Sequence, residues 1–110
     1  MKYLFLIRVD PEVEPDEADT DIQPWLDEMH ARGARLIGDR LRPAEEAKAV
    51  TVRGQETLVS EGPFTETKEL IGGFDVIECA DEAEALEIAA KHPVTHFGTV
   101  EVRACWPMEP

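Results

Sequence analysis

Two segments of the chain, Lys2–Val9 and residues 74–79, are rich in aromatic and branched residues and are apolar on both alternating faces. This pattern is typical of central strands whose two faces are both covered. Each segment is followed by apolar residues at helical spacing and then by a further strand pattern. A chain of 110 residues has room for one modest core. The sequence therefore predicts a single domain, residues 1–110, that contains two β-α-β units.

The first β-α-β unit is expected to run from Lys2–Val9 through a helix over residues 21–32 to a strand over residues 35–41. Thr20 and Gln23 have the spacing of a capping box at the start of this helix. The acidic segment before it, residues 10–21, is expected to be a solvated loop.

The second β-α-β unit is expected to consist of strand 74–79, a helix over residues 82–91 and a strand over residues 99–105. Asp81 and Glu84 form a second cap signature three residues apart. The apolar spacing of this helix predicts a packing face made of Ala83, Leu86, Ala89 and Ala90.

Between the two units, residues 50–53 and 57–60 alternate around Gly54-Gln55, which predicts a hairpin with a two-residue turn. The full pattern is α+β, and it favours the ferredoxin-like arrangement, in which both helices cover one face of an antiparallel sheet. The other face of the sheet is also apolar, and a patch of that size favours association. We therefore expect a two-fold homodimer that packs sheet to sheet, the dimeric α/β barrel.

The net charge of −13 argues against direct binding to nucleic acid, because phosphate binding depends on Lys and Arg. It favours solubility, or alternatively a basic protein partner or cationic ligand. No apolar run approaches a membrane span, so we expect no membrane association. Cys79 and Cys105 have neither metal-ligand nor disulfide-scaffold spacing, so reduced thiols in the cytoplasm are expected, with no metal site and no cofactor.

The run over residues 61–74, EGPFTETKELIGGF, joins a rigid Gly-Pro turn to an aromatic residue and interleaved charges. A loop of this kind can shape a small polar pocket. Glu61 next to the turn is a candidate acid or base, with Lys68 as its electrostatic partner. Phe64 and Glu66 are candidate ligand contacts. The alternative is a solvated loop with exposed ion pairs of little energetic value.

Three residues outside the loop are further candidates. His92, before Pro93, could act as a general base facing a pocket, or its charge could favour the C-terminal end of the preceding helix. Arg8 and Arg40 lie in strands and could recognise an anionic ligand. The alternative for Arg8 is structural pairing, and we expect Glu101 to be its partner because the first and last strands are neighbours in this topology.

The loop 61–74, the helix ending in Lys91-His92-Pro93, and the strand Val100-Glu101-Val102-Arg103 together resemble the YCII-related family. The resemblance is to the branch named for an Asp-Gly-Pro-Phe (DGPF) motif, with Glu61 in place of Asp. It implies a ferredoxin-like dimeric α/β barrel from the bacterial cytoplasm. In relatives an enzymatic role is inferred from a His on the first helix and an Asp before a Pro, but here the pre-proline residue is His92. Some relatives are joined to sigma-type transcription factors.

Together these features predict an uncharacterised YCII-like protein that binds a small polar molecule in a cleft beside the Gly-Pro-Phe loop. Any chemistry would be cofactor-free proton transfer, with Glu61 or His92 as base and Lys68 beside it. The alternative is a non-catalytic regulatory or protein-interaction module linked to sigma-factor-type transcription. A dimeric-barrel oxygenase or haem protein is a third reading, which rests on fold analogy alone.

Overall fold

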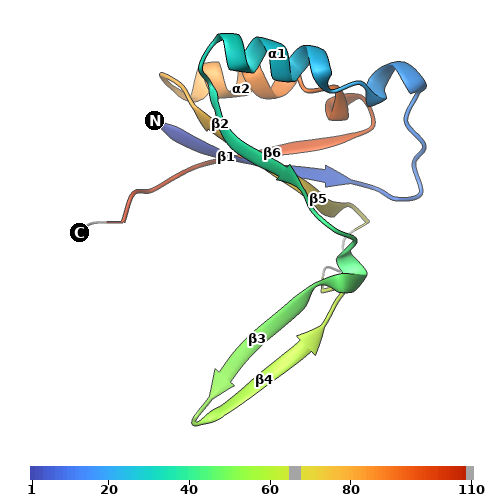
Figure 1. Ribbon diagram of the computed structural model, residues 1–110, viewed down its shortest axis with the longest axis vertical. Helices are drawn as coiled ribbons and strands as arrows, with labels where there is room; N and C mark the ends of the chain where they lie inside the picture. Colours follow the sequence, from blue (N-terminus) through green and yellow to red (C-terminus); the bar gives the residue numbers. More distant parts are fainter. Residues whose placement is uncertain (65–67, 109–110) are drawn as a thin grey trace.

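The computed structural model describes residues 1–64 and 68–108 (Figure 1). The strands and helices, in chain order, are β1 (Lys2–Val9), η1 (Glu17–Thr20), α1 (Gln23–Ala31), β2 (Arg35–Arg40), η2 (Ala44–Glu46), β3 (Lys48–Arg53), β4 (Glu56–Glu61), β5 (Leu70–Glu78), α2 (Glu82–Ala90), η3 (Pro93–His96) and β6 (Gly98–Ala104). The three η segments are short 3-10 helices. The predicted α+β class is confirmed.

Among the described residues the strands form two separate sheets. The larger sheet has the strand order β2-β5-β1-β6, and every neighbouring pair is antiparallel. Each α-helix therefore connects two parallel strands that leave room for one strand between them. The smaller sheet is the β3–β4 hairpin, in which Arg53 faces Glu56 across Gly54-Gln55. The two β-α-β units and the hairpin turn are as predicted.

Both α-helices cover the same face of the larger sheet, and the core lies between them and that face (Figure 1). Tyr3 and Phe5 of β1 and Ile77 of β5 point into this core and are almost fully buried. Trp25 and Met29 of α1 close it from the other side. Burying an aromatic or large aliphatic side chain contributes roughly 1.5–3 kcal/mol, so these few residues supply much of the stability of the chain.

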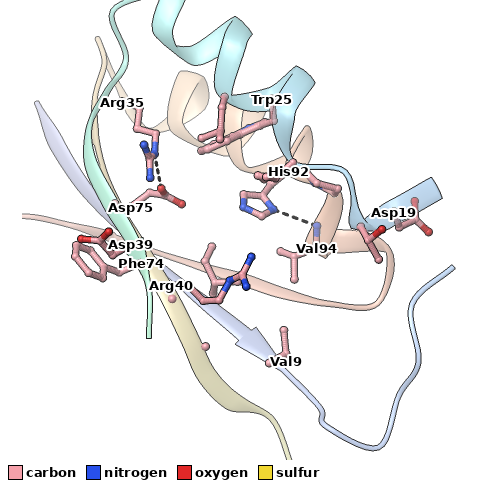
Figure 2. A pocket seen from close by; sticks show the side chains of 18 of the residues that line it. Val9, Asp19, Trp25, Arg35, Asp39, Arg40, Phe74, Asp75, His92 and Val94 are labelled. Carbon is pink, nitrogen blue, oxygen red and sulfur yellow. Dashed lines mark hydrogen bonds and ion pairs between the residues drawn. The ribbon is translucent and has the colours of Figure 1, made fainter. Parts of the chain in front are cut away.

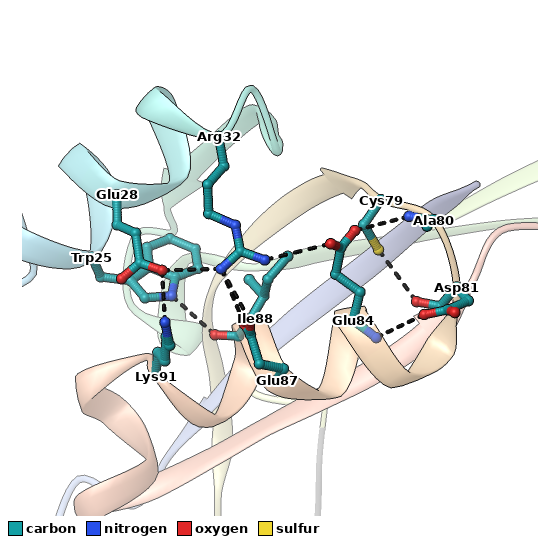
Figure 3. Close-up of polar contacts among 10 residues, drawn as sticks. All are labelled: Trp25, Glu28, Arg32, Cys79, Ala80, Asp81, Glu84, Glu87, Ile88 and Lys91. Atoms are coloured by element: carbon teal, nitrogen blue, oxygen red, sulfur yellow. Dashed lines mark hydrogen bonds and ion pairs between the residues drawn. The ribbon is translucent and has the colours of Figure 1, made fainter.

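The two helices are also joined by polar contacts (Figure 3). Arg32 follows α1 and bonds to Glu28 of α1 and Glu87 of α2, each with a shortest distance of 3.0 Å. Lys91 donates to the same Glu28 carboxylate at 2.8 Å. The hydrogen bonds from Lys91 and Arg32 lower the pKa of Glu28. In the interior, the indole of Trp25 donates to the carbonyl oxygen of Ile88 at 3.1 Å. The helix layer is thus one connected unit above the sheet.

Two details of the helices differ from the predictions. The first helix begins at Gln23, and the predicted capping box is absent because the Thr20 hydroxyl donates to the Glu17 carbonyl oxygen within η1. In α2 the buried residues are Ala85, Ile88 and Ala89, so Ala89 of the predicted packing face was correct and Ala83, Leu86 and Ala90 were wrong. The larger side chain of Ile88 turns that side of the helix toward the sheet. The second cap was predicted correctly, since the Asp81 carboxylate accepts from the N–H of Glu84 at 2.9 Å.

Candidate functional site

A cavity of about 520 Å³ lies between the helix-covered face of the larger sheet and the segments α1 and η3 (Figure 2). Ile7, Val9, Trp25 and Phe97 give it apolar walls. Arg35, Asp75 and His92 are polar residues that also line it. Ligand pockets commonly have volumes of about 300–1,000 Å³ and combine apolar walls with a few polar groups. The size and lining of this cavity suit a small molecule.

An ion pair between Arg35 of β2 and Asp75 of β5 lies in the wall of the cavity. Arg35 Nε donates to Asp75 Oδ1 at 2.6 Å, and both side chains are largely buried. The register of β2 against β5 shifts between Arg35 and Ile37, which marks a β-bulge. Because a bulge inserts one residue, Arg35 and Gly38 both project from the helix-covered face although they are three positions apart. The bulge therefore brings the guanidinium group to the carboxylate.

Gly38 leaves the space that this ion pair occupies. A Cβ atom at position 38 would overlap Asp75 Oδ1 and Arg35 Nη2, and it would lie 2.7 Å from the carbonyl oxygen of Phe74. Burial raises the pKa of Asp75, and the hydrogen bond from Arg35 opposes this rise. The site thus contains a carboxyl group that is more readily protonated than a surface aspartate.

His92 lies between α2 and η3 and is buried at the cavity (Figure 2). Its Nδ1 accepts a hydrogen bond from the N–H of Val94 at 3.1 Å and so caps η3. Burial, with the nearby charge of Arg35, lowers the pKa of His92 to about 4. The ring is therefore neutral at pH 7. Because Nδ1 accepts, the proton of the neutral ring is on Nε2.

The orientation of His92 is fixed by Trp25, whose ring centroid is 4.7 Å from that of His92 with an angle of 54° between the planes. Trp25 is in turn held by its bond to Ile88. Figure 2 shows the His92 ring turned toward the Arg35–Asp75 side of the cavity. The neutral imidazole thus presents an N–H donor on the side of the cavity where a buried carboxylate lies.

The cavity brings together two of the residues predicted from sequence, His92 and Arg40. Arg40 lies at the end of β2, and its guanidinium group makes no ion pair with any other residue in the part of the chain that the structure describes. It is therefore available to an anionic group of a ligand.

The predicted residues of the Gly-Pro-Phe loop lie away from this cavity. Glu61 is exposed at the end of β4 and pairs with Lys48 at 3.4 Å. Lys68 is exposed and pairs with Asp10 at 3.5 Å. Phe64 is about half exposed, and Glu66 lies outside the described residues. Within one chain, Glu61, Phe64 and Lys68 do not converge with His92, because these three residues lie near the base of the hairpin rather than beside η3.

Arg8 lies on the face of the sheet opposite the helices. Its Nη1 donates to Glu101 at 3.0 Å, which confirms the predicted pairing of the first and last strands. Its Nη2 donates to Glu69 at 3.2 Å, and the Thr99 hydroxyl donates to the same carboxylate at 3.0 Å. These contacts join β1 and β6 to Glu69, the residue before β5, within one chain.

Sequence reasoning missed Arg35 and Asp75, the two charged residues that define the cavity wall. A signal for Asp75 was present, since it is an acid directly between Phe74 and Val76 in the strand pattern FDVIEC. Buried charges are rare unless they are paired. The partner could not be identified from sequence because it depends on the register between β2 and β5 and on the bulge.

The chain belongs to the YCII-related domain family, whose model matches residues 1–109. It is also similar to an uncharacterized protein of Rhizobium meliloti (strain 1021), with 43% identity over 68 residues. That match covers 58% of this chain and 53% of the relative, so the chain spans about half the length of the curated relative it matches.

No helix in residues 1–64 and 68–108 is long and apolar enough to cross a lipid bilayer. Among the same residues, no three His, Cys, Asp or Glu side chains are grouped so that they could hold a metal ion.

Proposed function

We propose that this YCII-related protein binds a small molecule with an apolar body and a carbonyl or carboxylate group in the cavity between the sheet and the helices. The observation that carries the proposal is His92, a buried neutral imidazole whose Nε2–H is free of the capping bond that occupies Nδ1. This site replaces the predicted cleft beside the Gly-Pro-Phe loop.

Each part of the cavity has a role in this proposal. The apolar walls bury the body of the ligand, which supplies most of the binding free energy. His92 donates a hydrogen bond to the carbonyl or carboxylate oxygen. Arg40, which has no ion-pair partner among the described residues, adds an attractive charge at the same cavity. A site whose N–H donates a hydrogen bond to the ligand discriminates strongly against ligands without an acceptor oxygen, because the donor would then remain buried and unpaired.

The same groups permit proton-transfer chemistry without a cofactor. Burial raises the pKa of Asp75 toward the range in which a carboxyl group can both accept and release protons. A neutral histidine that donates to a carbonyl oxygen stabilises negative charge on that oxygen. Asp75 would therefore act as the acid or base and His92 as the electrophile. In this arrangement His92 is a donor, and the base role that we considered from sequence passes to Asp75.

A ligand screen by thermal shift tests the proposal. The probes are a panel of small carboxylic acids and carbonyl compounds with aliphatic or aromatic bodies, each with an alcohol of the same shape as its control. The proposal expects stabilisation by a subset of the acids or carbonyl compounds and not by the matched alcohols.

The matched variants are His92→Asn and His96→Asn. Asn at position 92 can still accept from the N–H of Val94 and cap η3, but it lacks the Nε2–H donor. His96 is exposed in the same short helix. We expect His92→Asn to weaken binding at least tenfold and His96→Asn to leave it unchanged. Equal binding by both variants would disprove the role of His92.

The finer structural assignment is also a proposal. The split β-α-β topology supports a ferredoxin-like fold in a single domain, and the uncovered sheet face supports a homodimeric α/β barrel. The Gly-Pro-Phe sequence supports membership of the DGPF branch of the family. Both cysteines are free, which supports a reducing cytoplasmic location.

A second candidate is a non-catalytic interaction module, as expected from relatives joined to sigma-type transcription factors. The exposed apolar side chains of the hairpin favour protein contact of some kind. A direct measurement separates the two candidates. Saturable binding of a carboxylate that depends on His92 supports the cavity, whereas binding of a purified sigma-type factor with no response to any probe supports the module.

A further inference from the structure

The β3–β4 hairpin extends away from the body of the molecule (Figure 1). The Cα radius of gyration is 16.1 Å, compared with roughly 13 Å for a compact domain of this length. Val50 and Val59 are cross-strand partners on one face of the hairpin, and they are 65% and 62% exposed. Val52 lies on the same face and is also exposed. The valine face is therefore not packed against any other part of the described chain. An isolated two-stranded hairpin is only marginally stable in water, so packing of this face against another surface would stabilise it.

A second unpartnered apolar surface is the face of the larger sheet opposite the helices. Its central residues, Leu4, Leu6, Phe74 and Val76, are only partly buried and lie outside the core cluster. Ile37 of the edge strand β2 is on the same face and is 55% exposed. Figure 1 shows the hairpin on this side of the sheet, away from α1 and α2.

The base of the hairpin is held in a defined position. The N–H of Gly62 donates to the Ala47 carbonyl oxygen at 2.8 Å. A Cβ atom at Gly62 would lie 2.6 Å from the carbonyl oxygen of Ala44, so only glycine permits this close approach to η2. These contacts close the base of the hairpin against η2.

The accessible area indicates how large a partner surface is missing. The chain exposes 8037 Å², whereas a compact monomer of 12.3 kDa exposes roughly 6,100 Å². The excess of roughly 1,900 Å² falls within the roughly 1,000–2,500 Å² that each subunit of an obligate homodimer buries. A standard transient interface buries only about 800 Å² per partner.

We propose that the β3–β4 hairpin is an arm whose valine face packs against the β2 edge of the uncovered side of the larger sheet of a second copy of this chain, beside the sheet-to-sheet contact of the proposed barrel. The inference deepens the proposed homodimer by naming the segment that grips the partner. A two-fold axis places each arm on the other copy, so both kinds of apolar surface are covered in one closed pair.

Sedimentation velocity of the full chain over 0.1–100 µM tests the arm. The variant Val59→Asp places a charge on the valine face, and Ser60→Asp places the same charge on the next residue, which projects from the opposite face of the hairpin. We expect a dimer for the parent chain, a dissociation constant raised at least tenfold in Val59→Asp, and a change of less than about threefold in Ser60→Asp. Far-UV circular dichroism should show that both variants remain folded, because neither residue belongs to the core.

A cross-link identifies the surface that the arm contacts. In a Cys105→Ser background, chains carrying Val50→Cys are mixed with chains carrying Ile37→Cys and treated with a short bis-maleimide. The matched control replaces Ile37→Cys with Leu86→Cys, since Leu86 is 52% exposed on α2. We expect cross-linked heterodimers with Ile37→Cys and not with Leu86→Cys.

A monomeric parent chain, equal weakening by Val59→Asp and Ser60→Asp, or cross-linking through Leu86→Cys would each overturn the proposal. These outcomes are independent of the thermal-shift screen, because the cavity is on the helix side of the sheet. Failure of the arm and failure of the ligand site can therefore be recognised separately.

Discussion

Acidification is expected to destabilise this protein through His92. The ring is buried, its Nδ1 accepts from the N–H of Val94, and it lies beside Trp25 and near the charge of Arg35. A proton can be added to the folded ring only at Nδ1, which would break the cap of η3 and place a positive charge close to a guanidinium group. The unfolded chain can add the same proton without either cost.

The size of the effect follows from the difference between the two pKa values. Burial lowers the pKa of His92 from 6.5 to about 4 in the folded protein. Each pKa unit corresponds to about 1.4 kcal/mol, so the unfolding free energy should fall by roughly 3 kcal/mol as the pH falls from above 6.5 to about 4. The unfolding free energy falls on acidification because the unfolded state binds more protons than the folded state between pH 6.5 and about 4. This is a large fraction of the 5–15 kcal/mol typical of a domain.

Urea unfolding at pH 7.5, 6.5, 5.5 and 4.5, followed by far-UV circular dichroism, measures this loss. His92→Asn is the reference, since it keeps a side-chain acceptor for the cap and cannot titrate. The measured quantity is the difference in unfolding free energy between the parent chain and this variant at each pH. Groups that titrate in both proteins cancel in that difference to first order.

Asp75 is the main group that acts in the opposite direction. Burial raises the pKa of Asp75 in the folded protein above 3.8, the usual value for an aspartate. The stability that Asp75 contributes is therefore present at low pH and is lost as the pH rises through this folded-state pKa. Asp75 is present in both proteins, so the difference isolates His92. Parallel pH profiles for the two proteins, or an NMR titration of the His92 ring near pH 6.5, would refute the reasoning.

Two further predictions concern the wall of the cavity. Arg35→Met should lower the free energy of unfolding by about 3 kcal/mol or more, because it leaves the Asp75 carboxylate buried without its partner. Arg35→Met combined with Asp75→Leu should recover most of that loss in urea unfolding. A double variant no more stable than Arg35→Met would contradict this. Gly38→Ala should cost about 2 kcal/mol or more by thermal unfolding, because its Cβ atom would displace the ion pair. Gly72→Ala is the control, since its Cβ atom would lie 3.2 Å from a Val9 methyl group and should cost less than about 1 kcal/mol; equal losses would show that the ion pair is not the cause.

Most of the fold could be predicted from the sequence because its signals are local. The strand β1 was predicted with its observed bounds, and the hairpin was predicted from Gly54-Gln55 between two alternating segments. Both depend on a period of two residues and on turn chemistry, which are properties of short segments. The packing face of α2 could not be decided in the same way. An alanine-rich helix offers more than one apolar stripe, and contact of Ile88 with the core selects between them.

The candidate site was harder to predict because it depends on contacts between distant segments. Arg35 and Asp75 are 40 residues apart, and their side chains meet only because of the register of β2 and β5 and the bulge after Arg35. A shift of one residue in that register would turn one of the two side chains to the opposite face. No pattern within either strand carries this information, whereas His92 could be selected because the adjacent proline marks a helix end.

The Gly-Pro-Phe loop shows that the most distinctive part of a sequence need not line the cavity of the chain. Its residues serve the base of the hairpin, where Gly62 approaches Ala44 and Glu61 pairs with Lys48 across the two strands. The cavity is instead built mainly from β1, α1, β2, β5 and η3, and of the described residues of the 61–74 run only Gly72, Gly73 and Phe74 of β5 line it. Rigid turns and clustered charges are needed wherever a chain must leave its sheet at a fixed angle, so such a pattern indicates a structural constraint before it indicates chemistry. In the proposed dimer the loop acts through the base of the arm, and hence through the second copy that the arm contacts.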